Sequence, residues 1–152
     1  MGANIELIGM LWGLQFATSA IIGFFVIKLH DKRNLNYTLL KLCFLLKGAA
    51  WTLLIFNQTI PTLIVVQIII GISGAIGGPA FYSMVSEHLD KNKHIKDWGT
   101  FQLIANTVIA LSSFLSGIII VKYGFTAILI IMSLLEYVSL SILHFNKPTK
   151  IS

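Results

Sequence analysis

The stretch Gly71-Ile72-Ser73-Gly74-Ala75-Ile76-Gly77-Gly78-Pro79-Ala80 lies deep inside an apolar run that extends from Thr62 to Val85. It holds four glycines within eight residues. Each glycine inside a water-soluble helix costs about 1 kcal/mol relative to alanine, so the run is unsuited to such a helix. In lipid, by contrast, small residues allow helices to approach one another closely. The stretch therefore predicts a membrane-spanning helix.

Four small residues of this stretch fall on one helical face. Gly71, Gly74, Ala75 and Gly78 recur at positions i, i+3, i+4 and i+7, which form a smooth surface for a neighbouring helix. Pro79 removes a backbone donor near the end of this face and favours a bend. We interpret the face as a hinge or close-packing surface in a moving bundle, and static tight packing is the alternative.

The composition extends this prediction to the whole chain. Of its 152 residues, 56% are hydrophobic and only 11% are charged, and the mean hydropathy is +0.85. These values exclude an ordinary soluble domain and are typical of a polytopic membrane protein. The net charge of +5 does not indicate a nucleic-acid partner, because the basic residues collect between apolar runs. We predict one transmembrane domain over residues 1–152 with the lipid bilayer as its surroundings.

Five segments are long enough to cross a bilayer, for which about 20 apolar residues are needed. They give an all-α transmembrane bundle and cover approximately residues 7–27, 37–56, 62–85, 98–121 and 125–145.

Basic residues beside the spans predict the orientation, because basic loops are retained in the cytoplasm. On one side lie Lys28, Lys32, Arg33, Lys91, Lys93, Lys96, Lys147 and Lys150, whereas Lys122 stands alone on the other. This bias predicts a multi-pass protein of the plasma (cytoplasmic) membrane with its amino terminus outside and its carboxyl terminus inside.

Two charged residues stand near the middle of spans, where a charge costs about 2.5 to 3.5 kcal/mol even on the most permissive scale. Lys47 lies ten residues into the second segment and Glu136 lies eleven residues beyond Phe125, so both are near mid-depth. We predict that they form an intramembrane ion pair or a coupling site. A structural pair or a snorkelling lysine is the alternative.

The order of these features resembles the major facilitator superfamily of secondary transporters. That family has the pattern Gly-x-x-x-Asp-Arg-x-Gly-Arg-Lys in a cytoplasmic loop, and here Asp31 matches the aspartate while Lys32 and Arg33 keep the positive charge. Ile27 and Asn34 occupy the glycine positions. The resemblance implies a cytoplasmic gating loop at Asp31, Lys32 and Arg33.

The resemblance covers nearly the whole chain, which corresponds to helices two to six of one six-helix half. It implies a partial permease that moves a small solute by alternating access, together with a second half or other helices. Gln67 stands where proton-coupled members of the family carry an arginine. Whether the chain corresponds to a first or a second half stays open.

Neutral polar residues in the first, third and fourth segments are candidates to line the substrate cavity, since these segments resemble helices at the central path. Without charges, such a cavity would favour an uncharged or amphipathic solute. Interhelical hydrogen bonding is the alternative role for each residue. The candidates are Gln15, Ser19, Gln67, Ser73, Gln102, Asn106 and Ser113.

No residue pattern indicates catalysis, a cofactor or a metal site. The four histidines lie at or beyond the ends of spans, and Cys43 is the single cysteine. We therefore expect a protein that is not an enzyme. The alternative to a transporter is a structural or accessory integral membrane protein without transport activity.

Overall fold

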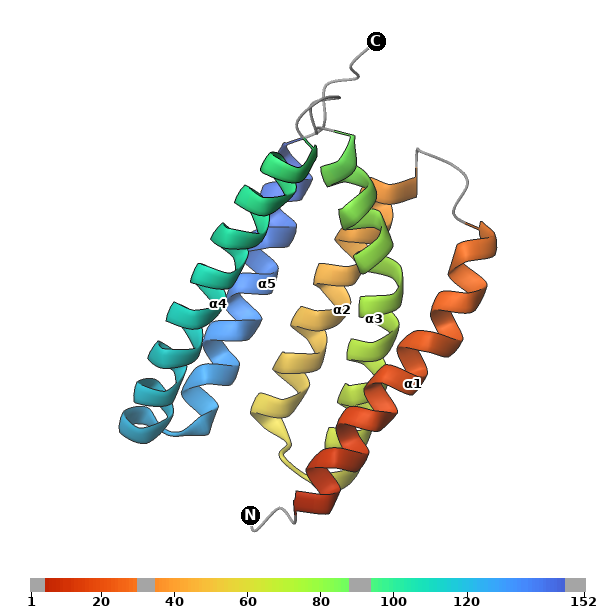
Figure 1. Cartoon of the computed structure of the whole chain (residues 1–152). Helices are drawn as coiled ribbons and strands as arrows, with labels where there is room; N and C mark the ends of the chain where they lie inside the picture. Colours follow the sequence, from red (N-terminus) through yellow and green to blue (C-terminus); the bar gives the residue numbers. More distant parts are fainter. Residues whose placement is uncertain (1–4, 30–34, 88–93, 147–152) are drawn as a thin grey trace.

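Five α-helices make up the described part of the chain in the computed structural model (Figure 1). The structure describes residues 5–29, 35–87 and 94–146, and these residues form no β-strand. The helices are α1 (Ile5–Leu29), α2 (Asn36–Phe56), α3 (Ile60–Ser86), α4 (His94–Tyr123) and α5 (Phe125–Phe145). The all-α class and the five long apolar helices that the sequence predicted are confirmed.

Each helix is long and apolar enough to cross a membrane. The shortest, α2 and α5, have 21 residues, which corresponds to about 32 Å at 1.5 Å per residue and matches the roughly 30 Å hydrocarbon core. The start of α4 differs most from expectation, because the helix begins at His94 rather than near Trp98. The sequence estimate followed hydropathy alone, whereas helical hydrogen bonding continues through the polar residues of this first turn.

The helices pack in an order that differs from their order in the chain. The main contacts join α1 to α3, α3 to α2, α2 to α5, and α5 to α4. Consequently α2 and α3 lie in the middle of the bundle, while α1 and α4 lie at its two sides (Figure 1).

A cluster of buried apolar side chains lies where α2, α3 and α5 meet. Because lipid tails are as apolar as these side chains, close packing stabilises this contact rather than removal from water. The cluster consists of Ala50 and Leu54 from α2, Val66 and Ile70 from α3, and Leu129 from α5. Trp51 packs against its edge.

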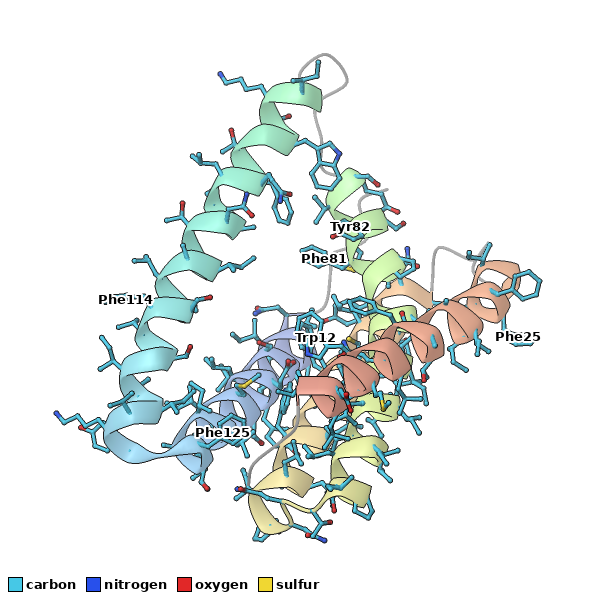
Figure 2. All side chains as sticks on the ribbon, turned by 60° about the horizontal axis from the view of Figure 1, so that its bottom comes forward. Trp12, Phe25, Phe81, Tyr82, Phe114 and Phe125 are labelled. Atoms are coloured by element: carbon cyan, nitrogen blue, oxygen red, sulfur yellow. The ribbon has the colours of Figure 1, made fainter. Side chains whose placement is uncertain are left out.

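The two outer helices present large apolar side chains to their surroundings. Phe25 of α1 and Phe114 of α4 point away from the bundle in Figure 2, and 70% of Phe114 is exposed. None of the described residues of α4 is buried. Such surfaces suit contact with lipid or with further helices.

Short turns connect the helices at one end of the bundle. Pro61 lies in the first turn of α3, where the missing backbone N–H of proline costs no helical hydrogen bond. Gly124 joins α4 to α5 with a backbone φ of 83°, a conformation that glycine adopts far more readily than other residues. With five passes, the first residue of α1 and the last residue of α5 lie at opposite ends of the bundle (Figure 1). The gating-loop residues Asp31, Lys32 and Arg33 lie outside the described residues.

Candidate functional site

The α1–α3 contact brings two of the candidate cavity residues together around the glycine face. A Cβ atom at Gly71 would lie 2.6 Å from the backbone oxygen of Gln15 and 2.9 Å from Cβ of Thr18. One turn further along, Gly74 faces the hydroxyl of Ser19. These distances mean that α1 touches the backbone of α3 at Gly71, where any larger side chain would separate the two helices.

The small-residue face of α3 that the sequence predicted, from Gly71 to Gly78, contacts α1 over only part of its length. A Cβ atom at Gly78 would have no neighbouring atom within 4 Å, whereas Ala75 is buried. Pro79 lies inside α3, which continues to Ser86. The contact with α1 is thus concentrated at Gly71.

Gln67 lies one turn before Gly71 on the same face of α3. The residue is half-buried, and its Oε1 atom is buried without a hydrogen-bond partner in the structure. A buried side-chain acceptor normally has a donor, so this oxygen is an exception among the described residues.

Ser73, the second cavity candidate on α3, packs against α2. It is fully buried and donates a 2.8 Å hydrogen bond to the backbone oxygen of Ile70, and its hydroxyl lies against the thiol of Cys43 on α2. Gly77, which follows one turn later, packs so closely that a Cβ atom there would collide with Cys43 Sγ. Ser73 therefore belongs to the α2–α3 contact.

The candidate residues of α4 stand apart from those of α1 and α3. Gln102 and Asn106 are exposed and make a 3.3 Å hydrogen bond to each other. Ser113 is also exposed. Since the main helix contact of α4 is with α5, the structure does not bring these three residues to the α1–α3 contact.

Lys47 and Glu136 face each other across the α2–α5 contact. Each is half-buried, and their side chains are close enough to interact electrostatically. Oε2 of Glu136 is nevertheless buried without any hydrogen-bond partner, so Lys47 does not bond to it. The two charges are neighbours, but this buried oxygen is left unpaired.

A hydrogen-bond network beside these charges was not predicted from the sequence. Thr52 of α2 lies 2.7 Å from the hydroxyl of Ser133 and 3.2 Å from that of Tyr137, both on α5. It also donates to the backbone oxygen of Gly48 at 2.8 Å, and the Tyr137 ring packs on Gly48. The spacing of Ser133 and Tyr137, one turn apart, was the signal available in the sequence.

An aromatic cluster joins the end of α3 to the start of α4. The ring centroids of Phe81 and Phe101 are 5.9 Å apart, and those of Tyr82 and Trp98 are 6.1 Å apart. Figure 2 shows Phe81 and Tyr82 on α3 near this part of α4. Trp98 thus makes packing contacts with the end of α3.

Across residues 5–29, 35–87 and 94–146, no group of three or more His, Cys, Asp or Glu side chains could hold a metal ion.

Comparison with curated proteins and with solved structures finds no match. Residues 1–151 match the family model of the Major Facilitator Superfamily. The chain therefore belongs to this superfamily, whose members are membrane transporters rather than enzymes.

Proposed function

We propose that this chain is part of a permease that moves a small solute by alternating access, with its site near the middle of the bilayer. Family membership supports a transporter-type protein. The observation that carries the specific proposal is the unpaired, buried Oε1 of Gln67. An unsatisfied buried acceptor costs about 1 to 3 kcal/mol, and a solute that donates a hydrogen bond to it removes this cost.

The neutral polar side chains of α1 and α3 favour a solute without net charge. Gln15, Ser19 and Gln67 are neutral side chains that lie on α1 and α3. An amide both donates and accepts hydrogen bonds, so these residues suit an uncharged or amphipathic molecule with hydroxyl or amide groups. Ser73 lies on the same helix but at the α2–α3 contact.

The backbone contact at Gly71 supports relative motion of α1 and α3. A contact between two smooth surfaces can slide without interlocking side chains, and Gly74, Gly78 and Pro79 extend the same helix segment. We infer that this segment is the hinge or sliding surface, and that the loop at Asp31, Lys32 and Arg33 is the gate on the cytoplasmic side.

The polar groups of α4 support a further partner in the membrane. Gln102 and Asn106 are exposed within a helix that has the composition of a membrane span. Polar groups inside a bilayer normally face a protein interior or a water-filled cavity. We infer that a second half or other helices cover this face. The same observation favours the second candidate function, an accessory membrane protein that assembles without transporting a solute.

The experiment that tests this proposal compares solute uptake by cells that make the protein with uptake by cells that lack its gene. A panel of labelled neutral, amphipathic and anionic solutes would identify the class. Gln67→Leu should lower uptake of the transported solute about tenfold, equivalent to roughly 1.4 kcal/mol. Gln58→Leu is the matched control, because Gln58 lies in the turn between α2 and α3 and should leave uptake unchanged.

Two results would contradict the proposal. Preferred uptake of a strongly anionic solute would exclude the neutral cavity. If the cells with and without the gene take up every solute equally while the chain purifies within a stable assembly, the accessory role replaces transport.

A further inference from the structure

Glu136 occupies an unusual position for a carboxylate. It lies eleven residues from the start of α5, about 16 Å along a 21-residue helix, and therefore near the middle of the predicted span. Its Oε2 atom is buried and has no donor. An ionised carboxylate without hydrogen bonds in an apolar environment is far less stable than a neutral carboxyl group.

The ionisable groups around Glu136 are few. From α2, Lys47 interacts with the carboxylate and the Cys43 thiol lies close enough to be influenced by it. From α4, which also packs on α5, residues 98–121 contain no ionisable side chain. On α5 itself, the neighbouring Tyr137 directs its hydroxyl to Thr52. Lys47 is thus the one cation in the described chain that acts on Glu136.

Two arrangements of this pair satisfy the chemistry. If Glu136 is protonated, its carboxyl group is neutral and needs no ion pair, which matches the observed unpaired Oε2. If Glu136 is ionised, it requires a charged donor, and a change of the Lys47 or Glu136 rotamer would supply one. An ionised Glu136 with Lys47 unbound would leave its buried Oε2 charged and without a partner, which is the least stable combination.

From this geometry we propose that Glu136 is a proton-binding site at the α2–α5 contact, and that loss of its proton closes an ion pair with Lys47. On protonation, a proton from water forms an O–H bond on the carboxylate and the ion pair opens. Lys47 keeps its own proton, and no oxidation or reduction occurs. This inference goes beyond the proposed transport function, because proton binding is measurable without any solute.

Trp51 is placed to report the change. It lies one turn after Lys47 on α2, and its Nε1 atom is buried without a partner. A movement of the Lys47 ammonium group alters the electric field at this indole. A variant in which Trp12 and Trp98 are replaced by phenylalanine leaves Trp51 as the single tryptophan.

The test measures the proton directly by infrared spectroscopy of the full chain in lipid vesicles. A protonated carboxylic acid has a carbonyl stretching band that a carboxylate lacks. Glu136 is one of six carboxyl side chains. We expect it to give such a band at a pH where the exposed carboxyl groups are already ionised, and we expect this band to disappear as the pH rises further and to be absent in Glu136→Gln. In Lys47→Met the band should persist to higher pH, because the cation that stabilises the carboxylate is gone. Emission from Trp51 should change over the same pH interval as the band.

The matched control is Glu6→Gln, which removes a carboxylate from the first turn of α1 and should leave the band and its pH dependence intact. Helical circular dichroism of each variant identifies failure to fold, and the charge-swapped double variant Lys47→Glu/Glu136→Lys gives a second readout through Trp51. The proposal is wrong if, at a pH where the exposed carboxyl groups are ionised, the band survives in folded Glu136→Gln. It is also wrong if Trp51 emission in the charge-swapped protein and in the parent is equally insensitive to pH.

Discussion

The backbone oxygen of Gln15 lies 2.6 Å from the position that a Cβ atom would take at Gly71, so α1 and α3 meet backbone to backbone. Both partners at this point are fixed, because one is a main-chain atom and the other would be attached directly to the main chain. The contact tolerates only glycine without a shift of one helix.

The first prediction concerns this contact. Gly71→Ala should destabilise the folded chain by about 1 to 3 kcal/mol, the range for overpacking a tight contact. Gly78→Ala is the matched control in the same helix, because a Cβ atom there meets nothing within 4 Å. Thermal unfolding in detergent, followed by circular dichroism, measures the difference. Equal midpoints for the two variants would show that α1 and α3 do not approach at Gly71.

The second prediction concerns Gly77 and Cys43. A Cβ atom at position 77 would collide with Cys43 Sγ, so Gly77→Ala should be destabilising in the parent protein. The added Cβ atom would also lie 2.5 Å from Cβ of Cys43. In the Cys43→Gly background both Cys43 atoms are gone, and the same substitution should be better tolerated, with a coupling of about 0.5 to 3 kcal/mol. A double-mutant cycle on unfolding free energies measures this coupling. Strict additivity of the two substitutions would contradict the contact.

The third prediction tests the hydrogen bond between α2 and α5. Thr52 and Ser133 are 2.7 Å apart, and interhelical hydrogen bonds in membranes contribute about 0.6 kcal/mol on average. Thr52→Val and Ser133→Ala should each lower stability, and the double variant should lose less than the sum of the two. Ser139→Ala is the control, because its hydroxyl donates within α5 to the backbone oxygen of Leu135. A control loss as large as that of Ser133→Ala would argue against the interhelical bond.

The fourth prediction addresses orientation in the membrane. In a Cys43→Ala background, Gln58→Cys should react with a membrane-impermeant thiol reagent added to intact cells, since the bias in basic residues predicts that this turn is outside. Glu87→Cys, at the opposite end of α3, should react only after permeabilisation. Labelling of both cysteines in intact cells, or the reverse pattern, would overturn the predicted orientation.

The family and the helical class were accessible from the sequence because each depends on local information. Apolar runs of about 20 residues report spans without any knowledge of packing, and the resemblance to the major facilitator superfamily rested on loop charges and glycine positions in linear order. Both are confirmed. The helix ends were less accessible, as the early start of α4 at His94 illustrates.

The site depended on which helices meet, and only part of it was predictable. Gln15, Ser19 and Gly71 come together because α1 packs on α3, whereas Gln102 and Asn106 lie on α4 and bond to each other. In a chain that is apolar on nearly every face, hydropathy does not reveal which face of a helix is buried. The Thr52 network and the Cys43–Gly77 contact were missed for this reason.

The five apolar spans of the described residues and the transporter family follow from the sequence alone, because hydrophobic length and loop charge are local properties of the chain. The tertiary structure decided the partners of each helix, the unpaired oxygens of Gln67 and Glu136, and the separation of α4 from the α1–α3 contact. In lipid the hydrophobic effect does not select among helix faces, so close packing and hydrogen bonds make that selection in three dimensions.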